Sequence, residues 1–389
     1  MATGRGLDVV LFGATGFTGE LTAEYLARHA PAGLRWGLAG RSLDRLVAVR
    51  GRLAAMIDPA LAELELLVAD VGDRDAVRAV AEAASVVITT VGPYITYGDA
   101  LVAACAEAGT DYVDLTGEPE FVDQVYLRHH AKAVATGARL VHCCGFDSIP
   151  HDLGVYFTVK QLPEGVPIAV EGFVRASGTF SGGTFHSAIT AFSRLRQGAR
   201  TAAQRRKVEG RGVRRVRGTA GKPKHVKDIG WALPMPSIDP QVVLRSARAL
   251  ERYGSEFSYG HYVAVKRLPV AVGLVGGVAG LVALAQLPPA RNWLLGRKKA
   301  GDGPTARQRD KAWFKVVFHA EGGGHRVVTE VSGGDPGYGE TSKMLAEAAM
   351  CLAVDELPPT SGQVTTAVAM GDALLDRLIA AGIRFRRLD

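Results

Sequence analysis

Cysteine is scarce in this sequence. Four cysteines occur among 389 residues, and they form neither a Cys-x-x-Cys pair nor a cluster with histidine. This spacing argues against a disulfide framework and against a structural zinc site, so we expect a chain of the reducing cytoplasm that holds no metal. The N-terminus enters an apolar run within ten residues, and we therefore expect no signal peptide.

Internal repeats are lacking as well. The net charge is +7, and 47% of the residues are hydrophobic. A chain of this length and composition can bury a substantial core, and we expect two domains or one domain with a large insertion.

The stretch from Leu7 to Arg41 carries the most informative pattern. An apolar run ends at a turn with glycines at every third position, a segment with helical spacing follows, and a second apolar run ends at Gly40. Strand, glycine turn, helix and strand within about thirty residues are typical of a βαβ unit that holds the pyrophosphate of a dinucleotide at its helix N-terminus. The residues expected to bind the cofactor in this turn are Gly13, Thr15, Gly16, Phe17, Thr18 and Gly19.

The tip of the second strand indicates which dinucleotide is bound. An NAD site places an acid near this tip for the ribose 2′-hydroxyl, whereas the nearest acid here, Asp44, falls inside the next expected helix. Arg41 occupies the tip with Ser42 beside it, and a guanidinium can form two hydrogen bonds with a 2′-phosphate. We therefore predict NADP as the cofactor, with Arg41 and Ser42 among its ligands.

Strand and helix patterns alternate as far as about residue 150. Buried strands that are linked by helices predict a parallel, doubly wound sheet. We therefore assign an α/β fold with a Rossmann-type NADP-binding domain at 1–150. An inserted α+β substrate domain is expected at 151–335, and a helical C-terminal return at 336–389 is expected to pack on the first domain.

The loops after the strands should line the cofactor site, because ligands bind at the carboxyl ends of parallel strands. Asp70 follows the third strand and is expected at the adenine edge, or alternatively as a helix N-cap. Gly92, Pro93 and Tyr94 follow the fourth strand, and Asp147 follows the sixth. Tyr94 and Asp147 are the catalytic candidates, with Tyr94 as proton or oxyanion donor and Asp147 as an orienting group. The alternative is that both only shape the pocket.

Other side chains fit catalysis less well. The Tyr-x-x-x-Lys pattern of short-chain dehydrogenases occurs twice, at Tyr156–Lys160 and Tyr262–Lys266, and the first has no serine or threonine at a suitable spacing before it. His142 is expected in the core of the sixth strand. His151, in the loop after that strand, is better placed for a functional role.

Two runs set the second domain apart. Between residues 194 and 217 ten residues are Arg or Lys and one is acidic, which predicts a basic loop without the interleaved aromatics of a nucleic-acid site. The stretch Pro269–Leu287 has no charge, and as a helix it would be about 28 Å long, at the lower edge of spanning length. Three interpretations are open: a buried helix or hairpin, a patch that dips into a lipid surface, or a transmembrane span.

Four motifs, at residues 13–19, 91–94, 145–150 and 334–343, together resemble those of the saccharopine dehydrogenase-like oxidoreductases. The similarity covers nearly the whole chain and is greatest to the trans-acting enoyl reductase branch of actinobacterial lipid synthesis. It implies a Rossmann domain with an inserted α+β domain, and reduction of a polyketide-type enoyl chain for a synthase that lacks this activity. His151 stands where relatives often have serine.

We therefore expect an NADPH-dependent enoyl reductase that acts in trans on long-chain or polyketide-type acyl thioesters in lipid biosynthesis. A saccharopine-type imine-forming dehydrogenase and a non-catalytic lipid-surface protein are the alternatives. The expected partners are an acyl thioester, free or on an acyl carrier protein, and a membrane surface or lipid, but no nucleic acid; self-association is left open. The expected location is the cytoplasm, including the inner face of the plasma membrane.

Overall fold

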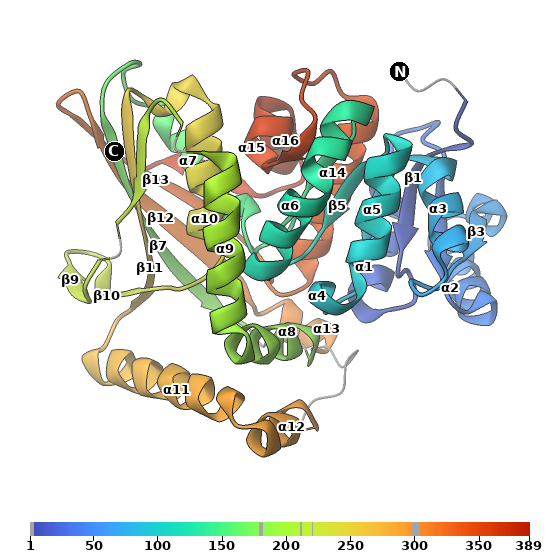
Figure 1. The fold of residues 1–389 in the computed structure, drawn as a ribbon, viewed down its shortest axis with the longest axis horizontal. Coiled ribbons are helices and arrows are strands. Elements are labelled where there is room, and N and C mark those ends of the chain that lie inside the picture. The colour runs from blue at the N-terminus through green and yellow to red at the C-terminus, as the bar shows by residue number, and fades with distance from the viewer. Residues whose placement is uncertain (1–3, 179–181, 211, 220, 297–303) are drawn as a thin grey trace. The chain divides into compact units, whose positions relative to one another are not determined.

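The computed structural model describes residues 4–178, 182–210, 212–219, 221–296 and 304–389, without the side chains of 182–185. The chain divides into two compact units (Figure 1). Unit 1 comprises Met1–Thr116, Phe121–Phe146 and Tyr338–Arg377, and unit 2 comprises Gly117–Glu120, Asp147–Gly337 and Leu378–Asp389.

Unit 1 is built on a seven-stranded sheet with the order β14-β6-β5-β4-β1-β2-β3. Every neighbouring pair is parallel, and Val10 of β1 lies opposite Gly37 of β2 on one side and Val87 of β4 on the other. The strands are β1 (Leu7–Phe12), β2 (Trp36–Gly40), β3 (Glu65–Val68), β4 (Ala84–Thr89), β5 (Asp111–Asp114), β6 (Arg139–Val141) and β14 (Gly362–Val364). The predicted doubly wound parallel sheet is confirmed.

The helices of unit 1 begin where the sequence supplies caps or tight turns. Ser42 caps the second helix by accepting from the Arg45 N–H, and Asp73 caps the third by accepting from the N–H groups of Asp75 and Ala76. The elements are α1 (Phe17–His29), α2 (Leu43–Met56), η1 (Pro59–Glu63), α3 (Arg74–Ala83), α4 (Tyr94–Tyr97), α5 (Asp99–Ala108), α6 (Pro119–Thr136), α14 (Gly339–Val354), α15 (Thr366–Ala369) and α16 (Gly371–Ala380).

Unit 2 is built on an eight-stranded mixed sheet with the order β15-β13-β12-β7-β11-β10-β9, and β8 pairs with β11. The central strand β7 runs parallel to β11 and antiparallel to β12. The strands are β7 (Ile168–Ser177), β8 (Arg215–Gly218), β9 (Lys224–Val226), β10 (Gly230–Pro234), β11 (Glu256–Val265), β12 (Trp313–Gly322), β13 (His325–Gly333) and β15 (Arg384–Arg387). Strands β7 to β13 fall within the predicted α+β insertion. The last residues do not follow the predicted helical return to the first domain, because β15 pairs with β13 and residues 378–389 belong to unit 2.

Two helices of unit 2 pack on this sheet. Helix α7 (Ile149–Val159) contacts β12 and β13, and α10 (Asp239–Ala249) contacts β11. The other helical elements of the unit are α8 (Gly182–Ser193), α9 (Leu195–Glu209), η2 (Glu251–Tyr253), α11 (Leu268–Gln286), α12 (Pro288–Gly296) and α13 (Ala306–Arg309).

The basic run 194–217 is not the loop that we predicted. It contains α9 and β8, while Arg211 lies outside the described residues. Several of its arginines have acidic partners: Arg205 is 2% exposed and pairs with Glu209 in the same helix at 3.1 Å, and Arg194 pairs with the distant Glu120 at 2.7 Å. Arg214 donates to carbonyl oxygens between residues 247 and 254. Partners elsewhere in the unit thus allow this run to form regular structure.

The apolar run forms α11, and the interpretation as a buried helix is wrong. Only Ala271 and Ala285 of this helix are buried, whereas Val272 is 64% exposed. Near its C-terminus, α11 packs with α12 and α8 around the small cluster of Ile189, Ala285 and Leu294 (Figure 1). By length and composition α11 is apolar enough to cross a membrane.

Candidate active site

The turn between β1 and α1 lies at the carboxyl edge of the unit 1 sheet. Gly13 has φ +90°, and a Cβ at this position would lie 2.7 Å from the Val91 side chain and 2.8 Å from the Thr90 hydroxyl. The Thr90 hydroxyl also donates to the Gly13 carbonyl at 3.1 Å. The glycine turn is therefore held directly against the loop that follows β4, at the point where the strand order reverses.

The beginning of α1 fits a phosphate group. A Cβ on Gly19 would lie 2.1 Å from the Gly13 carbonyl oxygen, so only glycine allows this helix to start so close to the turn. The N-cap residue Gly16 provides no side chain to cap the helix. Backbone N–H groups and the positive end of the helix dipole are thus available for a pyrophosphate, with Thr15, Phe17 and Thr18 in the same turn.

The residues predicted to bind the 2′-phosphate of NADP lie between β2 and α2. Arg41 is exposed, and the Ser42 hydroxyl accepts the Arg45 N–H at 3.5 Å as the cap of α2. The Arg45 guanidinium donates to the Thr15 carbonyl at 2.7 Å, so a second cation contacts the glycine turn. Our sequence reasoning missed Arg45, although its position four residues after Arg41 places both on one side of the turn.

Asp70 follows β3 and is exposed. Its carboxylate accepts the Gly72 N–H at 2.9 Å and so closes a turn, while Asp73 is the cap of α3. The N-cap alternative for Asp70 is therefore wrong, and contact with adenine stays a prediction.

Gly92, Pro93 and Tyr94 belong to the loop beside the glycine turn. Pro93 is the N-cap residue of the short helix α4, which Tyr94 begins. The Tyr94 hydroxyl is buried, donates to the Thr89 carbonyl at 3.2 Å and accepts the Leu115 N–H at 3.2 Å. This geometry favours the interpretation that Tyr94 ties the ends of β4 and β5 together over a direct role in proton transfer.

Asp147 belongs to unit 2, next to Gly117. Its side chain is exposed to solvent, yet protein atoms crowd around it. This partial desolvation, with the nearby Asp239 carboxylate, raises the pKa of Asp147 to about 6, against an opposing effect of His151. An accessible carboxyl group that is partly protonated near neutral pH can donate a proton as a general acid.

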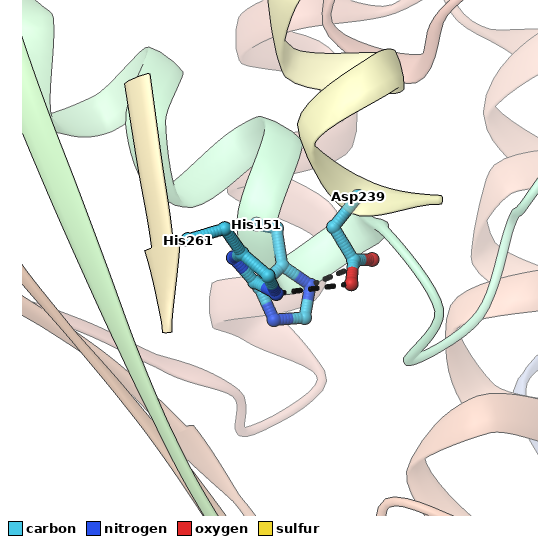
Figure 2. Close-up of side chains that lie close together, drawn as sticks. All are labelled: His151, Asp239 and His261. Carbon is cyan, nitrogen blue, oxygen red and sulfur yellow. Dashed lines mark ion pairs between the residues drawn. The ribbon is translucent and has the colours of Figure 1, made fainter. Parts of the chain in front are cut away.

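A cluster of three buried side chains was not predicted as a group. His151 of α7, Asp239 of α10 and His261 of β11 point toward one another (Figure 2). The His151 Nδ1 atom lies 3.3 Å from Asp239 Oδ1, and the His261 Nε2 atom lies 3.2 Å from Asp239 Oδ2. The two imidazoles hold the pKa of Asp239 well below its usual value against the effect of burial, while burial lowers the pKa of His261.

His142 lies in the core, as predicted. It is 5% exposed, and its Nδ1 atom lies 2.6 Å from the Asp114 carboxylate.

Comparison with known proteins identifies the family. Over 98% of this chain and 97% of the relative, the sequence is 39% identical to a Mycobacterium tuberculosis protein that is provisionally named a trans-acting enoyl reductase. It is 34% identical to the trans-acting enoyl reductases of Mycobacterium bovis BCG and Mycobacterium ulcerans, over 97% of each chain. The chain belongs to the trans-acting enoyl reductase family.

Two further comparisons agree with this membership. Residues 9–141 of this trans-acting enoyl reductase family member match the saccharopine dehydrogenase NADP binding domain, which confirms NADP as the cofactor of an oxidoreductase. The fold is similar to that of apo saccharopine dehydrogenase (L-Glu forming) from Saccharomyces cerevisiae, with a TM-score of 0.55 at 12% identity over 99% of this chain and 100% of that one. At this identity the likeness supports the fold alone.

Proposed function

We propose that this family member uses NADPH to reduce the carbon–carbon double bond of a long acyl thioester in lipid biosynthesis. The observation that carries the proposal is the similarity, over 98% of the chain, to a protein named as an enoyl reductase. The exposed apolar helix α11 in unit 2 supports a lipid substrate, since an enzyme for a small polar metabolite has no use for such a surface.

We assign different roles to Asp147 and Tyr94 in this reaction. NADPH, held by the glycine turn and Arg41, would supply a hydride for the β-carbon. The thioester oxygen would then carry enolate charge, and the α-carbon would require a proton. Asp147 is our candidate for handling this proton, because its carboxyl group is exposed and its pKa is raised to about 6. Tyr94, whose hydroxyl is engaged by two backbone groups, is assigned the task of holding the β4 loop in shape.

NADPH oxidation separates the alternatives. We expect turnover with a long-chain trans-2-enoyl thioester and none with an α-keto acid plus an amine. Turnover only with the second pair would replace the proposal by a saccharopine-type dehydrogenase. Cofactor binding with no turnover of either would leave a lipid-surface protein that retains the fold.

Arg41 is proposed to bind the 2′-phosphate. Arg41→Ala should weaken NADPH binding by roughly 10- to 100-fold, which corresponds to a lost charge-assisted hydrogen bond of about 1.5–3 kcal/mol, and leave NADH binding unchanged. Arg28→Ala, in the last turn of α1, is the matched control. If the Arg41 variant keeps the full preference for NADPH, Arg45 becomes the candidate.

Asp147 can be tested through pH. As the proton donor it must be protonated, so kcat/KM of the wild type should fall as pH rises through about 6. Asp147→Asn should lower kcat/KM by roughly 10²–10⁴-fold, the usual contribution of a general acid, and abolish this pH dependence. Asp310→Asn, which changes an exposed acid of the same unit, should leave both unchanged. A profile unaltered in Asp147→Asn would exclude this role.

We further propose that α11 lies in the surface of an anionic membrane. Its N-terminus follows Lys266 and Arg267, and Arg291 follows its C-terminus, so apolar residues are flanked by cations as in interfacial helices. The chain topology opposes a transmembrane span. Strands β11 and β12, before and after α11, both pair with β7, so both ends of the helix lie on one side of any bilayer.

Vesicle flotation distinguishes between a membrane, a second copy of the chain and an acyl carrier as the partner that covers α11. We expect the protein to float with vesicles that contain anionic lipid and less with neutral ones. Protein that stays in solution as a dimer would assign α11 to a second copy of the chain. A monomer that stays in solution but reduces carrier-bound substrate faster than the free thioester would assign it to an acyl carrier.

A further inference from the structure

The cluster of His151, Asp239 and His261 has the composition and shape of a metal-binding group. Its three side chains are 2%, 2% and 5% exposed and come from a helix start, another helix start and the middle of a strand. Each offers one ligand atom, and these atoms all lie within 4.8 Å of one another. The two imidazole rings stand at 78° to each other with centroids 5.0 Å apart, and both face the Asp239 carboxylate (Figure 2).

The two separations between a ring nitrogen and the nearer Asp239 oxygen are close to those found around a tetrahedral ion. Nitrogen and oxygen ligands about 2.0–2.2 Å from zinc lie about 3.3–3.6 Å from each other. The two nitrogen–oxygen separations here are 3.3 Å and 3.2 Å. The buried His261 Nε2 atom has the Asp239 carboxylate as its neighbour, but the angles of this contact are not those of a good hydrogen bond. Its orientation is that of a ligand aimed at a point shared with the carboxylate.

Surrounding groups hold the ligands as the outer partners of a metal site do. The Tyr259 hydroxyl lies 2.9 Å from Nδ1 of His261 and so fixes the ring with Nε2 toward Asp239. The carboxylate accepts a hydrogen bond from Ser148 on Oδ1 at 3.2 Å and from Ser237 on Oδ2 at 2.5 Å. Such partners fix the tautomer and direction of the ligands, and their loss usually weakens metal binding.

The donor set selects the kind of ion. Two imidazoles and one carboxylate suit zinc and other divalent transition metals, whereas magnesium and calcium prefer sites made of oxygen atoms only. A divalent cation would also offset the negative charge of the Asp239 carboxylate, which is 2% exposed. Three protein ligands leave a fourth position for water.

We propose that His151, Asp239 and His261 bind one divalent transition-metal ion, with zinc as the first candidate. This site goes beyond the reductase activity, and binding is testable without turnover. It also differs from the expectation that the chain holds no metal. That expectation was based on cysteine spacing and could not address ligands that lie 88 and 22 residues apart along the chain.

The test is metal analysis of protein that carries no polyhistidine tag. We expect close to one equivalent of zinc per chain as purified or after reconstitution, and visible absorption bands of a four-coordinate ion when Co²⁺ replaces it. Asp239→Asn should lose both signals while unit 1 still binds NADPH. His225→Asn, which removes an exposed histidine of β9, should keep both.

A second, milder variant tests the site in case Asp239→Asn does not fold. Tyr259→Phe keeps all three ligands and should weaken Zn²⁺ binding by about 10-fold in a chelator competition. The proposal is overturned if reconstituted wild type binds Zn²⁺ no more tightly than Asp239→Asn, or if Tyr259→Phe binds it as tightly as the wild type. Either result would leave a buried ionic network with no metal.

Discussion

Helices α14 and α11 are both long and apolar, yet they lie in opposite environments. In α14 ten of sixteen residues are buried, because the helix packs on α1 and on strands β1, β4 and β5 of unit 1. In α11 two of nineteen residues are buried, and its contacts with α8 and α12 cover little of its surface. Figure 1 labels both helices.

This difference shows that an apolar composition does not specify what covers a helix. Helix α14 also carries polar groups that need the fold: Glu347 accepts from the Tyr25 hydroxyl at 2.7 Å and pairs with Arg377 at 3.2 Å. Helix α11 has no charged residue, and apart from side chains such as Leu281 that pack on the small cluster near its C-terminus, most of its valines and leucines are exposed. Its burial therefore requires something outside the chain, which we propose is a membrane surface.

The largest expected difference is in stability. Leu345→Ala or Met350→Ala, at positions with 0% exposure in α14, should each lower the free energy of unfolding by about 2–5 kcal/mol. Val275→Ala, at a position with 52% exposure in α11, should change it by no more than about 0.5 kcal/mol. Urea unfolding measures both. Equal losses would mean that α11 is covered in solution, for instance by a second copy.

The next effect concerns vesicle binding. Val272→Glu places a charge on the exposed surface of α11 and should weaken binding to anionic vesicles at least tenfold, about 1.4 kcal/mol, with no loss of stability. Val213→Glu is the matched control, because this valine is 106% exposed and lies outside α11. If Val272→Glu and Val213→Glu weaken binding to anionic vesicles by the same factor, repulsion by the added charge explains the loss, and insertion of α11 is excluded.

A smaller effect should come from the cations that precede α11. Lys266→Gln and Arg267→Gln should each weaken binding to anionic vesicles by about 1 kcal/mol, or roughly fivefold, and more salt should reduce the difference. Binding to neutral vesicles should not change. A loss on neutral vesicles as well would show that the substitutions disturb the start of the helix.

The smallest effect is the pH dependence of the contacts after α14. The hydrogen bonds from Arg377 hold the pKa of Asp355 below its usual value of 3.8. The stabilisation is therefore complete above this value and is lost as pH falls through the lower pKa of the folded state. Between pH 5 and 3, wild type should lose more stability than Asp355→Asn. If the free energies of unfolding of the two proteins, measured with urea, fall in parallel as the pH is lowered, the prediction is contradicted. Helix α11 contains no titratable side chain and therefore adds nothing to this pH dependence.

The sequence by itself determined the elements whose physics is local. The strand, glycine turn and helix from Leu7 to His29 could be predicted, because the spacing of glycines and apolar residues is sufficient to specify such a turn. The parallel direction of the strands in the unit 1 sheet followed from helix-linked buried strands. Arg41 together with the missing acid indicated NADP, which comparison with known proteins confirmed.

Contacts between distant residues were decided by the tertiary structure alone. The basic run forms α9 and β8, and its arginines bind partners such as Glu120 and the carbonyls near Leu250. These partners lie far from the run in sequence, so no local pattern could predict them. His151, Asp239 and His261 meet because α7 packs against α10 and α10 packs on β11, which no local pattern encodes. The apolar residues of α11 and α14 did not by themselves tell which of the two helices is covered. Only the packing of unit 1 showed that α14 is covered, because burial depends on what neighbouring segments supply and not on a helix's own residues.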